Sequence, residues 1–281
     1  RNIGGFLLIA KLLIDHIEQK APDHEVAVLL SGGVDSISVA FAAHLAFKNI
    51  TCYSFQLDNN PSYDYAKAEE ICKIMNWDFV GVDIPVANLE NDFKRLLKHG
   101  CQKKTHFECV YPFLYVSEWI KEKYVLSGWA ADGYYGVSKK ACMHFKEPKS
   151  LFDQFRNDYF KRENRAGYLQ HKKLADKHKK VFVTPYLDKS VKKYFYKYNW
   201  HELNKPYQKH MVRDAFKSYF NKVGKVKNHL NLQLDSGIAN LFETLLNNNK
   251  INFNKRNRML EVYKDWKVCY NGDTSLENFF V

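Results

Sequence analysis

The chain has 281 residues, with 43 Lys and Arg against 31 Asp and Glu, and its net charge of +12 favours polyanionic ligands such as nucleotides, pyrophosphate and nucleic acid. This length allows one large domain or a nucleotide-binding core with a second lobe, and an apolar share of 46% allows a sizeable buried core. Six cysteines at irregular spacings exclude a disulfide framework, so we expect a cytoplasmic protein in a reducing setting.

The first predicted element is an amphipathic helix that includes the apolar run 5–14. This run has ten residues and contains Lys11, so it is too short to cross a membrane. No small-residue cleavage site follows it, so we do not expect a signal peptide. We expect the helix to pack on the core and the protein to have no membrane partner.

Strand-like and helix-like segments alternate through the first half of the chain. Residues 25–30 form a continuous apolar run, which is typical of a strand buried on both faces of a parallel sheet. Further strands are predicted over 50–57, 79–84 and 124–127, and helices over 36–47 and 65–76. The alternation predicts right-handed crossovers and an α/β fold with a doubly wound, mostly parallel, Rossmann-like sheet.

The pattern changes after Gly136, where no further alternation of strands is visible. Helices are predicted over 151–163, 190–198, 208–222 and 236–246. We place a domain boundary near residue 145, between an ATP-binding α/β core over 1–145 and a mostly helical lobe over 146–281 that completes the substrate pocket. Residues 139–180 carry 13 basic and 5 acidic side chains, which indicates either a solvated helical surface or a groove for a polyanion such as nucleic acid.

The turn Ser31-Gly32-Gly33-Val34-Asp35-Ser36 directly follows the first strand. Its two glycines let the backbone approach phosphate oxygens, the next helix adds its positive end, and both serines can donate hydrogen bonds. No Lys follows the glycines, so the turn is not the loop of kinases and motor ATPases. Asp35 stands there instead. Because a carboxylate beside phosphates requires a bridging cation, the turn predicts ATP together with Mg²⁺.

This turn, placed after an apolar strand, resembles the signature of the PP-loop ATP pyrophosphatases, which share an adenine nucleotide alpha-hydrolase-like fold. Most of residues 25–240 is similar to the synthetase domain of asparagine synthetase and β-lactam synthetase. The resemblance implies ATP contacts from the turn and from the ends of three predicted strands, at Leu29, Ser31, Gly32, Gly33, Val34, Asp35, Ser36, Leu57, Ser127 and Gly128.

Three later elements extend the resemblance. The stretch 126–136 resembles the family's Ser-Gly-Glu-Gly-Ala-Asp-Glu segment, in which Asp132 matches the second magnesium-binding Asp; Asp35 and Asp132 are therefore expected to hold Mg²⁺. Residues 184–188 resemble a Pro-Phe-Leu-Asp element, and 209–216 resemble a Lys-x-x-x-Arg-x-Ala-Phe helix. The loop 222–237 supplies the lysine that stabilises the adenylation transition state in the family, for which Lys227 is the first candidate and Lys225 the second.

The chain departs from the family at three places. Trp129 and Gly133 stand where the family has glutamates, and the first of these is implicated in handling the substrate, which argues against aspartate. Only 30 residues precede the turn, so we expect no glutaminase domain. Ammonia or an amine would then come from elsewhere, for example from a separate amidotransferase.

We weigh three functions. The leading hypothesis is an AMP- and pyrophosphate-forming ligase that adenylates a small-molecule carboxylate or carbonyl oxygen and then forms an amide or other C–N bond with ammonia or an amine. The second is modification of a nucleobase or tRNA, with zinc conceivable at His99, Cys101, His106 and Cys109. The third is a degraded synthetase that only binds ATP, which the two missing glutamates would explain.

Overall fold

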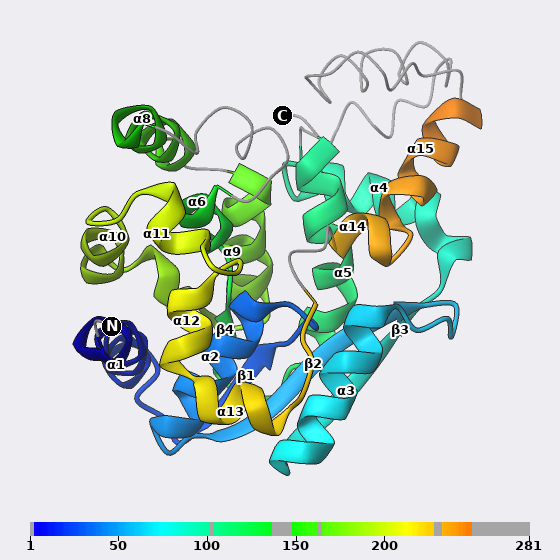
Figure 1. Cartoon of the computed structure of the whole chain (residues 1–281). Coiled ribbons are helices and arrows are strands. Elements are labelled where there is room, and N and C mark those ends of the chain that lie inside the picture. Colours follow the sequence, from blue (N-terminus) through cyan, green and yellow to red (C-terminus); the bar gives the residue numbers. More distant parts are fainter. Residues whose placement is uncertain (1–2, 102–103, 137–147, 162–164, 228–231, 249–281) are drawn as a thin grey trace.

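The centre of the molecule is a parallel sheet with helices on both faces (Figure 1). The computed structural model describes residues 3–101, 104–136, 148–161, 165–227 and 232–248. The sheet has five strands in the order β3-β2-β1-β4-β5, and all of its described pairs are parallel. Its strands are β1 (Glu25–Leu29), β2 (Asn49–Leu57), β3 (Asp78–Ile84), β4 (Tyr124–Ser127) and β5 (Val181–Val183). The predicted α/β, doubly wound fold is confirmed.

The strand order places a crevice beside β1. The chain moves from β1 outward through β2 to β3 and then returns to the other side of β1 as β4. Ligands of open α/β sheets bind at such a reversal, outside the carboxyl ends of the strands. Leu29 at the end of β1 pairs with Ser127 at the end of β4, so the two predicted ATP-binding segments leave the sheet side by side.

The described part after Gly136 is mostly helical, as predicted, but it also contains one strand, β5, which pairs with β4 at the edge of the sheet. Its sequence is only Val-Phe-Val, which is too short to give a recognisable alternation. Residues beyond 145 therefore contribute to the sheet as well as to the helices. The boundary near 145 stays a prediction, and residues 249–281 of the expected lobe lie outside the described residues.

Each predicted helix is present, with one break, and the structure adds helices that were not predicted, among them those over 89–98, 104–119 and 168–177. The expected helix over 208–222 is two helices, because the buried Phe216 leaves helical geometry at φ −111° and packs its ring 6.0 Å from that of Phe41. The helices are α1 (Ile3–Lys20), α2 (Val34–Leu45), α3 (Tyr63–Met75), α4 (Leu89–Lys98), α5 (Lys104–Trp119), α6 (Asp132–Tyr135), α8 (Lys149–Phe160), α9 (Tyr168–Lys177), α10 (Lys189–Phe195), α11 (Trp200–Asn204), α12 (His210–Ala215), α13 (Lys217–Lys222), α14 (Leu232–Asp235) and α15 (Ile238–Asn248).

Two apolar cores cover the two faces of the sheet. Successive residues of β1 alternate between them: Val26 and Val28 pack with α1, α2 and α10–α13, whereas Ala27 packs with α4, α5, α9 and α15. Figure 1 shows α1, α10 and α12 together on one side of the molecule and α4, α14 and α15 on the other. The helix α1 contacts α12 directly, so the beginning of the chain is packed against the region after residue 200.

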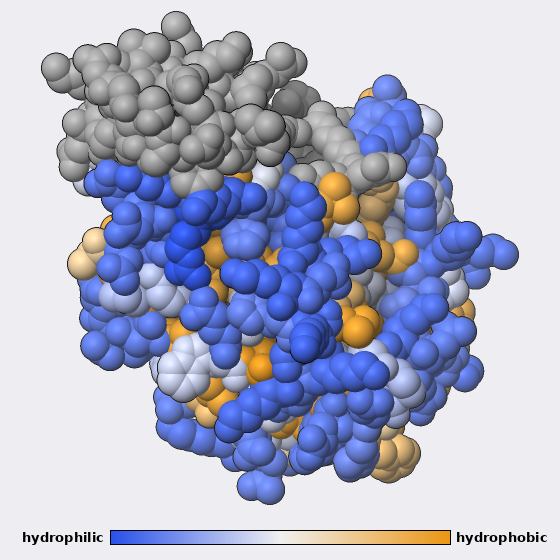
Figure 2. Space-filling view, turned by 180° about the vertical axis from the view of Figure 1, so that it is seen from behind, coloured by the Kyte–Doolittle hydropathy of each residue, from blue (hydrophilic) through white to orange (hydrophobic). Residues whose placement is uncertain are grey.

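The face seen in Figure 2 is mainly hydrophilic and carries only small separate apolar patches. Lys172, Lys173 and Lys177 of α9 are exposed, whereas Arg156 of α8 is fully buried. The basic stretch 139–180 is thus partly surface and partly core, and its segments 139–147 and 162–164 lie outside the described residues. Among the described helices, none combines the length and the apolar character that a membrane span requires.

The core position of β5 gives a stability test. Replacing Phe182 with Ala removes a ring that is 8% exposed and packs 5.8 Å from the ring of Phe113, so we expect a loss of about 3 kcal/mol in the free energy of unfolding. The matched change Val181→Ala replaces a residue of the same strand that is 41% exposed. It should lower the free energy of unfolding by less than about 1 kcal/mol. Urea unfolding measures both, and equal effects would contradict the placement of β5.

Candidate active site

The turn between β1 and α2 is held closed by its own serine hydroxyls. Ser36 Oγ accepts a hydrogen bond from the Ser31 N–H at 3.0 Å and lies 2.9 Å from the Ser31 carbonyl oxygen. The two hydroxyl oxygens of Ser31 and Ser36 are 3.0 Å apart. Gly33 caps α2 in an extended conformation, with φ −90° and ψ 150°. Ser36 therefore shapes the turn, and its contact with ATP stays a prediction.

The amino end of α2 can bind an anion. The N–H groups of Val34, Asp35 and Ser36 lie in the first turn of a 12-residue helix, where no preceding turn supplies an acceptor. Such groups and the helix dipole favour phosphate. The binding of phosphate at this turn stays a prediction.

Gly32 has a second role besides exposing its backbone. A Cβ at Gly32 would lie 2.9 Å from Asp64 Oδ1 and 3.1 Å from the Asp64 Cα, because the start of α3 packs directly on the turn. Asp64 is 5% exposed. Asp64 was not predicted as a site residue, since its position depends on this tertiary contact.

Gly128 brings the end of β4 onto the same turn. A Cβ there would lie 2.7 Å from the Asp35 carbonyl carbon and 2.7 Å from the Ser36 nitrogen. Both are backbone atoms, which a side-chain rotation cannot move away. The structure therefore joins Ser127 and Gly128 to Asp35 and Ser36, as the sequence predicts.

A buried lysine lies between the two carboxylates that were expected to hold Mg²⁺. Lys209 Nζ is 2.6 Å from Asp35 Oδ2 and 2.7 Å from Asp132 Oδ1, and its side chain is only 4% exposed. Asp35 is 18% exposed and Asp132 is 44% exposed, so the cluster extends from the interior to the solvent. The structure thus brings Asp35 and Asp132 together, with a cation already between them.

The electrostatics of this cluster depend on burial. Burial raises the pKa of the Asp35 carboxyl to about 6, with Lys209 lowering it and Asp132 raising it further. Burial lowers the pKa of the Lys209 ammonium, but the two carboxylates outweigh this effect and hold its pKa above the usual value. Asp35 Oδ1 is buried and has no hydrogen-bond partner among the described residues.

Lys209 was not among the predicted site residues, although it begins the Lys-x-x-x-Arg helix noted in the sequence. It precedes α12 with a positive φ of 57°. Its Nζ lies 5.2 Å from the centre of the Tyr135 ring, which adds a cation–π contact. Arg213, in the same helix, donates from Nη2 to the carbonyl oxygens of Val226 at 3.2 Å and Lys227 at 3.1 Å.

The two predicted catalytic lysines lie after α13, on the segment that leads to residue 228. Lys227 Nζ is 3.6 Å from the centre of the Tyr63 ring, and both Lys225 and Lys227 are exposed. Neither lines the cavity described below. Residues 228–231 of their loop lie outside the described residues. Their role in catalysis stays a prediction.

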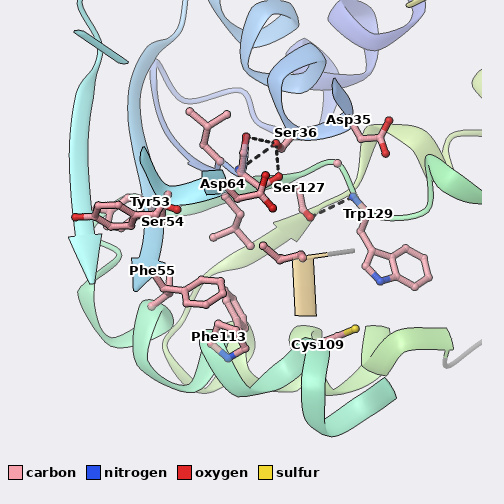
Figure 3. Close-up of a pocket in the computed structure, with 18 of the residues that line it drawn as sticks. Asp35, Ser36, Tyr53, Ser54, Phe55, Asp64, Cys109, Phe113, Ser127 and Trp129 are labelled. Carbon is pink, nitrogen blue, oxygen red and sulfur yellow. Dashed lines mark hydrogen bonds between the residues drawn. The ribbon is translucent and has the colours of Figure 1, made fainter. Parts of the chain in front are cut away.

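A cavity of about 270 Å³ opens at the carboxyl ends of β1, β2 and β4 (Figure 3). Of the predicted ATP contacts, it is lined by Leu29, Ser31, Asp35, Ser36, Ser127 and Gly128. Gly32, Gly33, Val34 and Asp132 lie beside it without lining it. The remaining lining comes from Leu30, Tyr53, Ser54, Phe55, Ser62, Asp64, Tyr65, Cys109, Pro112, Phe113, Val116, Trp129, His171, Leu232 and Gln233.

Leu57 lies outside the lining, although it was expected to contact adenine. Its carbonyl oxygen accepts a hydrogen bond from the Asn60 N–H at 2.8 Å, and its backbone pairs with Ile84. Residues earlier in the same strand, Tyr53 to Phe55, face the cavity instead. The contact of Leu57 with ATP stays a prediction.

Packing accounts for the two departures from the family pattern. The Trp129 ring stacks on the Tyr168 ring, with centroids 4.7 Å apart and planes at 29°. A Cβ at Gly133 would lie 2.3 Å from Tyr159 Cε1, so a glutamate has no space there while Tyr159 holds this position. An aromatic ring thus occupies space at each of the two positions.

The cysteines and histidines considered for zinc do not form a cluster in the part of the chain that the structure describes. No group of three or more His, Cys, Asp or Glu side chains there is arranged to hold a metal. Burial raises the pKa of the Cys109 thiol to about 12 and also raises that of Cys101. The Cys109 Sγ accepts a hydrogen bond from Gln233 Nε2 at 3.2 Å.

Comparison with known proteins bears on this geometry. The family model for asparagine synthase matches residues 9–181, which include the turn, Ser127, Gly128 and Asp132. Among solved structures, the chain is similar to NMN synthetase from Francisella tularensis, with 13% identity and a TM-score of 0.35 over 82% of this chain and 99% of that one. A search of curated proteins found no significant match.

Removing the buried cation should destabilise the site. Lys209→Met keeps the length of the side chain but leaves two neighbouring carboxylates without their shared partner, so we expect a loss of about 3 kcal/mol in the free energy of unfolding. The control Lys217→Met removes an exposed charge and should change it by less than about 0.5 kcal/mol. Urea unfolding at pH 7.5 measures both variants. If both variants lose the same free energy of unfolding, Lys209 does not hold the carboxylates together.

Adding a methyl group at Gly128 should separate β4 from the turn. We expect Gly128→Ala to lose about 2 kcal/mol of stability and to weaken ATP binding at least about tenfold, because the new Cβ would overlap backbone atoms of Asp35 and Ser36. The nearby Ala130 has a positive φ of 77°, which glycine adopts without strain. Ala130→Gly should therefore change stability by less than about 1 kcal/mol. Calorimetric titration with ATP distinguishes the two variants. Tight ATP binding by Gly128→Ala would contradict the close contact between Gly128 and the turn.

Proposed function

The chain belongs to the asparagine synthase family, and we propose that this ATP-using PP-loop synthetase activates its substrate by adenylation. In the first step, a carboxylate or carbonyl oxygen of the substrate attacks the α-phosphorus of ATP, and the bond from that phosphorus to the bridging oxygen breaks. Pyrophosphate leaves with the bonding electrons. In the second step, ammonia or an amine attacks the activated carbon, AMP leaves, and the nitrogen loses a proton as an amide or other C–N bond forms.

The Asp35–Lys209–Asp132 cluster beside the turn is the observation that carries this proposal. The ammonium group of Lys209 is buried and fixed by two carboxylates, so it is already oriented before the nucleotide arrives. A preorganised cation is most effective where charge develops on leaving phosphate oxygens. The amino end of α2 would bind those oxygens from the other side. Lys227 and Lys225 remain further candidates for the same role.

Mg²⁺ fits the residues present. Asp35 Oδ1 is a buried carboxylate oxygen without a partner in the described part of the chain, and Mg²⁺ prefers oxygen ligands of this kind. Asp35 and Asp132 would hold the ion. When bound, Mg²⁺ would neutralise charge on the phosphate oxygens.

The nitrogen source is open to direct test, because ammonia can be supplied as an ammonium salt. We propose free ammonia, an amine or a separate ammonia-supplying amidotransferase as the donor. An ammonium salt that supports product formation without glutamine would favour direct use of ammonia. Product formation that requires a second protein and glutamine would favour the amidotransferase.

The adenylation step predicts specific products. With pools of carboxylic acids and nucleosides, ATP should yield AMP and pyrophosphate, detected by exchange of labelled pyrophosphate into ATP. Asp35→Asn should lower kcat/KM at least about 100-fold because it removes one charge from the cluster, whereas Asp23→Asn at an exposed position should leave it unchanged. Formation of ADP and phosphate, or ATP binding with no turnover in any pool, would contradict the proposal. The latter result would favour a module that only binds ATP.

A further inference from the structure

Five aromatic rings form a continuous array along one wall of the cavity. Trp129 stacks on Tyr168, whose ring lies 6.2 Å from Phe182. Phe182 in turn lies 5.6 Å from His171, and His171 lies 5.2 Å from Phe113. Trp129, His171 and Phe113 line the cavity, while the other two rings support them from behind. The wall is therefore aromatic and held in place by packing, although neighbouring rings are tilted by up to 52°.

Among the described residues that line the cavity, the nearest charged group to Trp129 in Figure 3 is Asp35, which already pairs with Lys209. Of the described residues that line the cavity, none is Lys or Arg. The other acidic group, Asp64, packs against the turn at Gly32. Burial lowers the pKa of His171 and raises that of Cys109, so both are neutral near pH 7. A charged group placed against this wall would lose its hydration without a partner.

The position of Trp129 separates it from the place expected for adenine. In Figure 3, Trp129 lies on the same side of the cavity as Asp35, and Tyr53 and Phe55 lie on the opposite side. Tyr53 and Phe55 belong to β2, whose end is the expected adenine contact. A group that stacks on Trp129 would therefore be next to the reacting phosphate rather than in the adenine position.

We propose that Trp129 binds a planar, uncharged ring of the acceptor substrate, adjacent to the carboxyl or carbonyl group that becomes adenylated. This rests on the proposed function. The aromatic face of Trp129, set in a neutral wall, favours stacking with another flat ring. Aromatic and heteroaromatic rings both have such a face. The same wall disfavours an acyclic amino acid such as aspartate, whose second carboxylate and ammonium would have no partners there.

Binding of ring acids to the protein saturated with AMP tests the proposal. The probes are benzoate and pyridine carboxylates, with hexanoate and aspartate as acyclic comparisons. We expect the ring acids to bind at least about tenfold more tightly, and Trp129→Ala to remove about tenfold of that affinity. Trp129→Phe keeps a ring packed on Tyr168 and should retain affinity within about threefold, which separates lost stacking from lost folding.

Fluorescence locates the bound ring. Ring acids should quench tryptophan emission in the wild type and in Trp119→Phe, whose original ring is 59% exposed on α5, but not in Trp129→Phe. Equal binding of acyclic acids, no binding of any ring acid, or unchanged affinity of Trp129→Ala would overturn the proposal. Quenching by AMP alone would also overturn the proposal if Trp129→Phe abolishes it, because adenine would then be the group that stacks on Trp129.

The two proposals can fail separately. If ring acids bind at Trp129 and none stimulates pyrophosphate release, the adenylation proposal fails while the binding of a ring at Trp129 stands. If acyclic and ring acids stimulate release equally, adenylation stands and the inference about Trp129 fails.

Discussion

The arrangement of the site depends on one buried ammonium group. Asp35 and Asp132 follow neighbouring parallel strands, so the fold brings two carboxylates close together at the border of the interior. Such a pair is costly without a cation, and Lys209 supplies it from the start of α12. Because α12 also packs on α1, this ion pair connects the turn after β1 to α12 and, through α12, to the first helix of the chain.

Close backbone contacts complete the site around this ion pair. Gly32 admits the start of α3, whose Asp64 side chain lies against it, and Gly128 admits the backbone of the turn itself. The serine hydroxyls then close the turn internally. Backbone amides, the Lys209 ammonium and the Asp35 carboxylate thus lie close together, as the proposed binding of phosphate and Mg²⁺ requires.

The sequence predicted most of the sheet and the turn because these depend on local patterns. The apolar runs of β1 and β2 and the glycines after β1 can be recognised without tertiary information. By contrast, β5 has three residues, and the contact that buries Lys209 joins residues 174 positions apart. The aromatic wall likewise combines α5, α9 and β5, whose relative placement no periodicity reveals. Trp129 and Gly133 looked like losses in the sequence, yet each position is explained by aromatic packing.

The most direct test of this account is a crystal structure with Mg²⁺ and an ATP analogue that carries a methylene group between the α- and β-phosphorus atoms. The account predicts phosphate oxygens at the amino end of α2, Mg²⁺ bound by Asp35 and Asp132, and the Lys209 ammonium group within hydrogen-bond distance of a phosphate oxygen. Phosphates bound away from the turn, or a nucleotide complex in which Lys209 contacts only the two carboxylates, would contradict it.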